Sequence, residues 1–231
     1  MLQRHRELRS HGHLDVLATL PLDCRAAVVE QCRPRAVAKG GMLWLQGEPA
    51  AFIAILVSGK VMSLYEARNG RSGTVGFWTS GDLLGLGDIV MGGRQHTVRC
   101  LEDCHFLALP FEGLEDLVRR YPDFGIAMMH AFSLRLRWVS QLVVSLETAS
   151  ALERIGTVLL ALGERFGEPS DEGVRIDLNL THEQLAAIAG VTRQFANTSL
   201  KQLRDRGMIA AGRSLVLTDV PALERMVFSA D

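Results

Sequence analysis

The chain has 231 residues, enough for two domains that each bury a hydrophobic core. Its 25 basic and 26 acidic residues nearly cancel, which excludes a protein that coats nucleic acid through bulk positive charge. No run of about 18 apolar residues occurs, and the first thirteen residues are polar. We therefore expect no membrane span, no secretory signal and a cytoplasmic protein.

The first part of the chain predicts helices followed by a β domain. Apolar residues between Leu14 and Gln31, interrupted by Pro21, predict two short helices. Between Met42 and Pro110 the chain changes to short apolar runs separated by glycine-containing turns. The runs are MLWL, FIAILV, VMSLY, TVGFW and HFLALP. This pattern predicts an antiparallel sandwich or barrel.

Cysteine is sparse in this chain. The four cysteines are Cys24, Cys32, Cys100 and Cys104, and no two of them form a C-x-x-C pair. In a chain of this length they do not make a disulfide framework, so we interpret them as structural thiols.

A regular apolar stripe follows a short predicted helix at 111–120. Its members are Met129, Phe132, Leu136, Val139, Val143 and Leu146. They are spaced 3, 4, 3, 4 and 3 residues apart, as in the seam of a coiled coil, and predict pairing with a second copy. The alternative is a helix buried in its own domain, since Trp138, Leu142 and Val144 are apolar but lie off the seam.

The next segment begins with a helix. Ser150 and Glu153 form a capping box that predicts a helix as far as Phe166. A polar loop at 168–173 and a short strand, VRIDL, are predicted to follow.

The stretch 180–219 predicts a helix, a four-residue turn, a second helix and a hairpin. Thr181 and Gln184 form a second capping box. Gly190 allows the first helix to end with φ above zero, and Val191 supplies an apolar turn residue. Together these features indicate a helix-turn-helix.

The second helix, from about Thr192, is predicted to bury Phe195, Leu200 and Leu203 and to present polar side chains to DNA. The predicted DNA contacts are Thr181, Thr192, Arg193, Gln194, Asn197, Thr198, Lys201 and Arg213, the last at the tip of a two-stranded wing. From Thr192 to Arg213 five basic residues stand against one acidic residue, a net charge of +4. The alternative is a solvated helix and hairpin without a nucleic-acid role.

Several motifs now resemble the CRP/FNR family of bacterial regulators over nearly the whole chain. They are FIAILVSGKV, SGDLLGL, RQHTVRCLEDC, YPD, ERIGTVLLAL and LTHEQLAAIAGVTRQFANTSLKQLRDRGMI. The resemblance implies an α+β fold with three parts. These are an effector-sensing, jelly-roll-like antiparallel β-roll with N-terminal helices (1–121), a long dimerisation helix (122–149) and a winged helix-turn-helix (150–231).

The resemblance implies how family members that bind cyclic AMP hold it. A glycine–glutamate pair binds the ribose, an arginine–serine pair binds the phosphate, and a threonine and a serine contact the base. The matching positions here are Gly85, Leu86, Arg94, Gln95, Val139 and Ser140. A buried ribose hydroxyl facing Leu86 would lose its acceptor, at about 1–3 kcal/mol, so cyclic AMP is disfavoured. Arg94 either holds another anion or lies in solvent as a loop residue.

The resemblance also implies two candidate cofactors, because the family has an iron–sulfur branch and a haem-binding branch. For an iron–sulfur cluster, Cys24 and Cys32 are too sparse and Leu107 occupies the β-roll ligand position, so we expect no cluster. Haem remains a candidate through His96, His105 or His130, although a surface histidine is the more ordinary interpretation of each. His11 and His13, on either side of Gly12, are an equally weak metal site, and we predict no metal.

On the recognition helix, Arg193 matches a family arginine, whereas Gln194 replaces the usual glutamate and Thr198 a second arginine. An amide pairs with adenine where a carboxylate accepts from cytosine, so we expect a target motif different from the common family half-site.

These features predict a homodimeric transcriptional regulator that binds promoter or operator DNA under the control of an effector or redox signal. RNA polymerase and an unidentified small effector are the further partners expected. No catalytic motif appears: the β region lacks a metal-binding His-x-His set, and Gly-x-Ser-x-Gly and P-loop motifs are missing. The alternative is a ligand-binding or haem and gas-sensing module whose DNA role is secondary.

Overall fold

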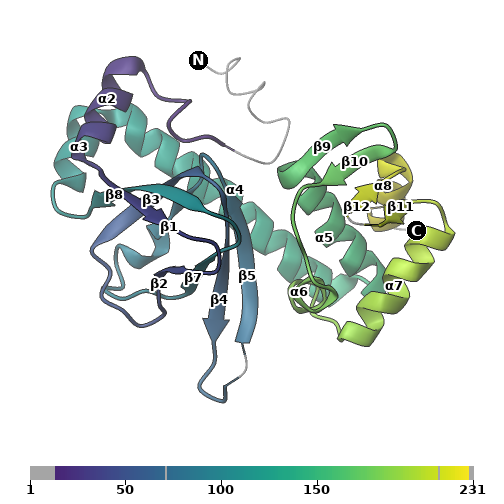
Figure 1. Cartoon of the computed structure of the whole chain (residues 1–231). Helices are drawn as coiled ribbons and strands as arrows, with labels where there is room; N and C mark the ends of the chain where they lie inside the picture. Colours follow the sequence, from purple (N-terminus) through teal and green to yellow (C-terminus); the bar gives the residue numbers. More distant parts are fainter. Residues whose placement is uncertain (1–13, 71, 213, 229–231) are drawn as a thin grey trace. The chain divides into compact units, whose positions relative to one another are not determined.

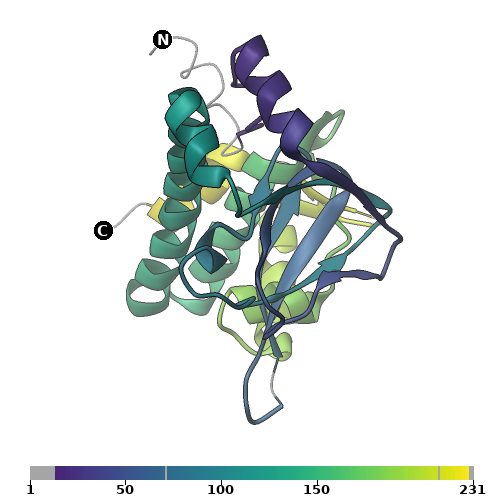
Figure 2. The same cartoon turned by 90° about the vertical axis from the view of Figure 1, so that its left-hand side faces the viewer.

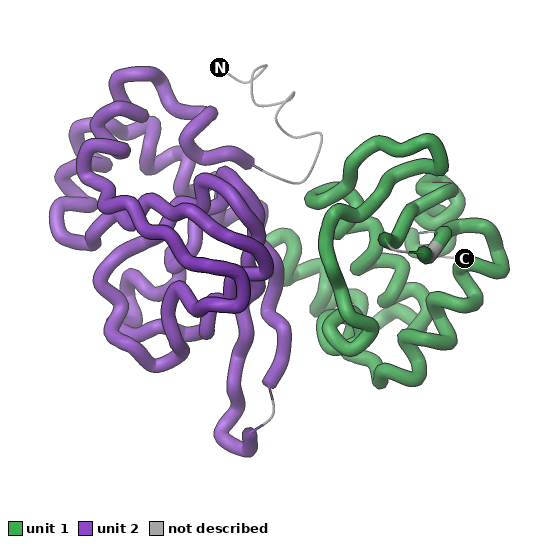
Figure 3. Tube along the Cα trace, viewed as in Figure 1, with its two compact units in different colours: residues 1–13, 136–231 green, residues 14–135 purple. Residues whose placement is uncertain are grey.

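The computed structural model describes residues 14–70, 72–212 and 214–228. The chain divides into two compact units, one spanning Leu14–Arg135 and the other beginning at Leu136 (Figure 3). The division falls inside the long helix α4 (Pro122–Thr148), whereas the sequence suggests boundaries at the two ends of that helix.

The first unit is an antiparallel β-roll with helices, as predicted (Figure 1). Its elements are α2 (Leu22–Gln31), β1 (Arg33–Val37), β2 (Met42–Trp44), β3 (Phe52–Ser58), β4 (Lys60–Glu66), β5 (Ser72–Thr79), β6 (Leu83–Leu84), η1 (Leu86–Asp88), β7 (Thr97–Cys100), β8 (Cys104–Pro110) and α3 (Leu114–Arg120). They form two four-stranded sheets, ordered β1-β8-β3-β6 and β2-β7-β4-β5. The hairpin of β4 and β5 extends beyond the other strands (Figures 1 and 2).

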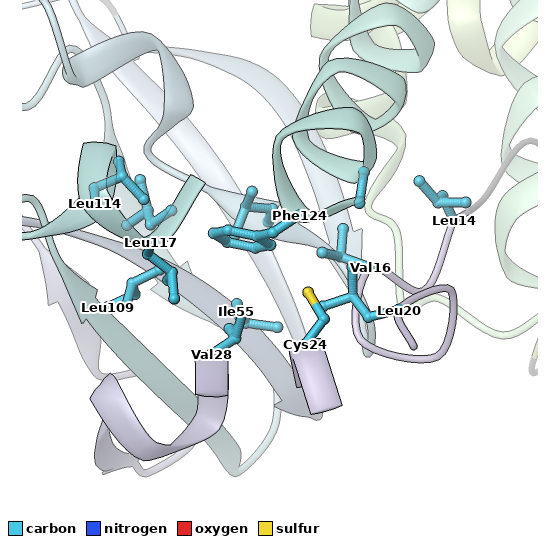
Figure 4. Packing of buried hydrophobic residues seen from close by; sticks show 13 residues of the cluster. Leu14, Val16, Leu20, Cys24, Val28, Ile55, Leu109, Leu114, Leu117 and Phe124 are labelled. Atoms are coloured by element: carbon cyan, nitrogen blue, oxygen red, sulfur yellow. The ribbon is translucent and has the colours of Figure 1, made fainter. Parts of the chain in front are cut away.

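Strand β3 shows how this unit is built. Side chains of a strand alternate between the two faces of its sheet. Ile53 and Ile55 belong to a cluster shared with α2, α3 and α4 (Figure 4), while Ala54 and Leu56 belong to a cluster formed between the two sheets. Because both faces are covered, β3 appears in the sequence as a continuous apolar run.

Three features of the first unit differ from the prediction. Residues 14–20 form a short turn rather than a helix, and α2 is the helix that the structure describes in this region. The β region begins at Arg33 and not at Met42, because β1 pairs with β8 at the edge of a sheet. Helix α3 begins at Leu114, after Gly113 with φ of 80°.

The second unit contains the winged helix-turn-helix. After the last turns of α4 come α5 (Ala151–Phe166), β9 (Gly167–Ser170), β10 (Gly173–Ile176), α6 (His182–Ile188), α7 (Arg193–Asp205), β11 (Ile209–Ala211), β12 (Leu215–Leu217) and α8 (Val220–Phe228). Helix α5 packs against α7 and α8, and the four strands form one sheet in the order β11-β12-β10-β9.

Both predicted capping boxes are confirmed. Ser150 caps α5 with Glu153, and Thr181 caps α6 with Gln184. One prediction in this unit is wrong: residues 168–170 are part of β9 rather than a loop, because they pair with β10.

Candidate functional site

The turn between α6 and α7 holds the two helices at a fixed angle. Gly190 has φ of 62°, a conformation that favours glycine. The N–H of Val191 donates to Ala186 O at 3.0 Å, and the Thr192 hydroxyl accepts from the N–H of Phe195 at 3.2 Å. Thr192 is therefore the N-cap of α7.

Helix α7 has one buried face and one exposed face. Ala196, Ser199, Leu200 and Leu203 are buried in the unit. The exposed set, which we call the α7 polar face, is Arg193, Gln194, Asn197, Thr198 and Lys201. These are the side chains that the sequence predicts to point outward, and Thr181 and Thr192 at the helix N-caps are exposed beside them.

Phe195 is placed differently from the prediction. It is 57% exposed rather than buried, because the smaller residues that follow it, Ala196 and Ser199, occupy the buried side of the helix. An exposed aromatic side chain thus lies in the first turn of α7, beside the polar face.

A side-chain hydrogen bond ties the two helices together. Nδ1 of His182, the first residue of α6, bonds with Oδ1 of Asn197 on α7. Asn197 is therefore held in one orientation on the polar face. Neither residue type predicts this pairing, since the two positions are 15 residues apart.

The wing is formed by β11 and β12, which pair as an antiparallel hairpin. The Thr218 hydroxyl donates to Gly207 O at 2.7 Å and fastens the base of the hairpin to the end of α7. Arg213, predicted to reach a phosphate, lies outside the described residues, as do His11 and His13.

The apolar stripe along α4 is exposed on both sides of the division between the two units. Its six side chains, from Met129 to Leu146, are between 40% and 62% exposed. Val144, taken from the sequence as evidence of packing elsewhere, is also exposed. At the end of the stripe, Leu146 contacts the helix-turn-helix: a Cβ added at Gly190 would lie 2.5 Å from Leu146 Cδ2.

Arg94 in the β-roll is neither in solvent nor open to a ligand. Its side chain is 1% exposed, and Nη1 lies 3.1 Å from Oδ2 of Asp88. Nη2 donates to Phe52 O at 2.9 Å. The guanidinium lies over the Trp44 ring, 3.7 Å from its centre, and over the Phe52 ring at 4.5 Å.

Burial lowers the pKa of Arg94, and the hydrogen bond to Asp88 opposes that shift. An arginine remains charged under these conditions, so the pair is a buried ion pair. Of the two interpretations of Arg94 given by the sequence, the solvent-exposed loop residue is therefore wrong.

Two family models match the chain. Residues 34–121 match the cyclic nucleotide-binding domain, and residues 153–226 match the Crp-like helix-turn-helix domain. The chain belongs to the CRP/FNR family of transcriptional regulators.

Whole-chain relatives agree with this assignment. The global nitrogen regulator of Synechocystis is 28% identical over 185 residues, covering 78% of this chain and 81% of the relative. A CRP-like cAMP-activated global transcriptional regulator of Mycobacterium tuberculosis is 25% identical and covers 87% and 90%. A CooA variant from Carboxydothermus hydrogenoformans has a similar fold, with a TM-score of 0.75 at 19% identity over 94% of this chain and 99% of that one. These relatives are regulators and not enzymes.

The residues predicted for the effector pocket of this CRP/FNR regulator have the following surroundings. Gly85 has φ of 84° and precedes η1, and Leu86 packs against the apolar cluster. Gln95 is exposed, and its backbone N–H donates to Asp88 Oδ1 at 3.1 Å. Val139 and Ser140 belong to the other unit. The residues around Arg94 do not fit a cyclic nucleotide phosphate, since a carboxylate of the chain already occupies the arginine.

The cysteines of the regulator have the properties of structural thiols. Burial raises the pKa of Cys32 to about 11 and, together with neighbouring Cys104, raises that of Cys100 to about 12. Burial also raises the pKa of Cys24 and of Cys104. Thiols with such pKa values contain little thiolate at neutral pH and react slowly with oxidants.

The histidines proposed as haem ligands differ in burial and in their contacts. Burial lowers the pKa of His96, whose ring lies 6.2 Å from that of Tyr65. Exposed His105 bonds to Ser58 Oγ through Nδ1 at 3.0 Å. Among the described residues no group of three or more His, Cys, Asp or Glu side chains is arranged to hold a metal ion. Within the same residues no helix is long and apolar enough for a membrane span.

Proposed function

We propose that this chain is a homodimeric, sequence-specific DNA-binding regulator whose α7 polar face contacts base edges in the major groove. The observation that supports the proposal is the division of α7 into a buried apolar face and an exposed face of arginine, glutamine, asparagine and lysine. Arginine and lysine pair with guanine, and glutamine and asparagine with adenine. Because Gln194 and Thr198 replace an acid and an arginine of the family, the target motif differs from the common half-site.

The exposed stripe on α4 supports the homodimer. A seam with this 3 and 4 spacing pairs two helices, and six exposed apolar side chains would be poorly placed in a monomer. Two recognition helices related by a two-fold axis would enter successive major grooves about 34 Å apart.

In this proposal the β-roll receives an effector or redox signal, which shifts the packing along the α4 seam and changes the orientation of the two recognition helices. The raised pKa values of the four thiols favour a ligand over thiol oxidation as that signal. RNA polymerase is the further partner that a promoter-bound regulator would meet.

The test is selection of binding sites from random duplex DNA, followed by gel-shift titration at several salt concentrations. We expect a two-fold symmetric motif with two half-sites one helical turn apart, and an affinity that falls steeply with salt. Recovery of the unaltered family consensus would contradict the role of Gln194 and Thr198. Binding by monomers without a preferred half-site spacing would contradict the dimer.

A further inference from the structure

The carboxylate of Asp88 has both of its oxygens engaged inside the β-roll. Oδ2 accepts from Arg94 Nη1 and Oδ1 accepts from the N–H of Gln95, each at 3.1 Å. The side chains of Arg94 and Asp88 are 1% and 8% exposed. A guanidinium and the backbone N–H of the next residue therefore share one buried anion, and that anion belongs to the protein.

These two donors are of the kind that hold phosphate groups. Guanidinium groups bind phosphate and carboxylate with similar geometry, and backbone N–H groups commonly donate to phosphate oxygens. The remaining contacts of Arg94 are also made within the unit, to Phe52 O and to the rings of Trp44 and Phe52. Arg94 thus has its charge neutralised before any ligand arrives.

We propose that Asp88 is a resident anion that closes the arginine site of the β-roll to phosphate-bearing ligands, including cyclic nucleotides. A phosphate that approached Arg94 would have to displace a carboxylate held beside it by the chain. The displaced carboxylate would be left buried without its counter-ion, which is costly, and the two anions would repel each other. Asp88 is thereby a specificity-determining residue for the effector, which must be recognised without a phosphate.

The same ion pair also has a role in the fold. The backbone of Arg94 is paired with the loop before β3, through its N–H to Glu48 O at 2.8 Å and its carbonyl to Gly47 N–H at 2.9 Å. The side chain joins this loop to η1 through Asp88 and to β3 through Phe52 O. The ion pair therefore fastens three segments of the roll.

The experiment compares the wild type with Asp88→Asn, which keeps the size and one acceptor of the side chain but removes its charge. The probes are cyclic AMP and, separately, inorganic phosphate, measured by titration calorimetry and by the melting temperature of the full chain. We expect the wild type to respond to neither probe. Asp88→Asn should show a saturable rise in melting temperature with phosphate, which is lost when Arg94→Gln is added. Comparison of the two probes shows whether the nucleoside contributes beyond the phosphate.

Asp82→Asn is the matched control. Asp82 is as buried as Asp88 and its carboxylate accepts from the N–H of Thr79 at 2.7 Å, so its loss removes a buried charge of the same unit without uncovering Arg94. We expect no phosphate-dependent stabilisation of this variant.

Two results would overturn the proposal: a wild type that binds either probe and loses that binding on Arg94→Gln, or a folded Asp88→Asn that binds neither. If Asp88→Asn alone does not fold, restored folding in Asp88→Asn with Arg94→Gln supports the proposal, because the defect is then the unpaired arginine. Gel shifts separate this inference from the proposed function. Failure of the wild type to bind DNA refutes the function alone, whereas DNA binding that depends on cyclic AMP refutes the resident anion alone.

Discussion

The two units of this regulator use arginine in opposite ways. In the β-roll, Arg94 is buried against the rings of Trp44 and Phe52, and its charge is neutralised by Asp88. In the winged helix, α7 is covered on one face only, so Arg193 remains exposed. Buried charge must be compensated within the fold, whereas exposed charge is available to a partner. Enclosure by the fold therefore distinguishes Arg94 from Arg193, which is exposed and which we propose contacts DNA.

The largest effect is expected for Arg94→Ala, which leaves Asp88 buried and without its counter-ion. We expect the β-roll to lose about 3–5 kcal/mol of unfolding free energy in urea. The control is Arg35→Ala, because the Arg35 guanidinium also lies over the Phe52 ring, at 4.6 Å, but its side chain is exposed. That variant should lose about 0.5–1 kcal/mol. Equal losses in the two variants would mean that the ion pair contributes nothing beyond ring contact.

The next effect concerns the exposed stripe of α4. Leu136→Ala removes one leucine from each copy at the centre of the proposed seam, at about 1.5 kcal/mol each, so the dimer dissociation constant should rise roughly a hundredfold. Sedimentation equilibrium measures this change. Gln141→Ala is the control, since Gln141 is exposed on the side of α4 opposite the seam. A dimer weakened equally by both substitutions would place the interface elsewhere.

Arg193→Ala tests the exposed arginine directly. It should cost about 1–3 kcal/mol of DNA binding and relax the preference at one base pair, with no loss of folding stability. Gel shifts on the selected site and on single-base variants give both numbers. Arg225→Ala, which removes an exposed arginine of α8, should leave the base preference unchanged. If Arg193→Ala weakens all sequences equally, Arg193 contacts phosphate and not a base.

Phe195 sharpens the comparison, since it is an apolar side chain on the exposed side of α7. Apolar groups in the major groove contact the C5 methyl group of thymine. We expect replacement of one half-site thymine by uracil to weaken wild-type binding by about 0.8 kcal/mol, roughly fourfold. Phe195→Ala should lose the same amount and become insensitive to that replacement. Sensitivity to uracil that persists in Phe195→Ala would assign the methyl contact to another residue.

The smallest effect distinguishes the two capping boxes. Hydrogen bonds from Ser150 lower the pKa of Glu153 below its ordinary value of 4.5. A lowered folded-state pKa means that this stabilisation is present above the unfolded pKa and is lost as the pH falls through the folded pKa. Because Glu153 is only partly buried, we expect a change of only about 0.3 kcal/mol. Thermal unfolding between neutral and acidic pH should show it in the wild type and not in Glu153→Gln.

The box on α6 is a natural control for that prediction, because Gln184 does not titrate. Thr181→Ala should destabilise α6 by about 1 kcal/mol at neutral and acidic pH alike. A pH-dependent effect of Thr181→Ala would show that the acid sensitivity arises outside the caps.

The features predicted from the sequence are those specified by residues close together in the chain. The α4 stripe, both capping boxes and the outward residues of α7 follow from helical periodicity or from pairs three residues apart. Strand β1 has no such signal, since Arg33, Pro34 and Arg35 are exposed and proline is tolerated at a sheet edge. No helix is predicted over 220–228, where α8 forms.

The candidate sites show the same division. The Arg94 environment is assembled from Asp88, six residues away, and from Phe52, 42 residues away, so only the folded roll brings them together. The bond between His182 and Asn197 likewise depends on the angle between α6 and α7. From the sequence, Phe195 is expected to be buried, as large apolar residues usually are. Only the structure shows that Ala196 and Ser199 occupy the buried side of the helix instead.

The proximity of Leu146 to Gly190 couples two parts of this unit. A side chain at position 190 would be strained by the backbone φ of 62° and would require the Leu146 side chain to shift. Leu146 is also the last member of the exposed stripe on α4. A substitution at this leucine would therefore change a contact at the turn of the helix-turn-helix and the proposed pairing surface together.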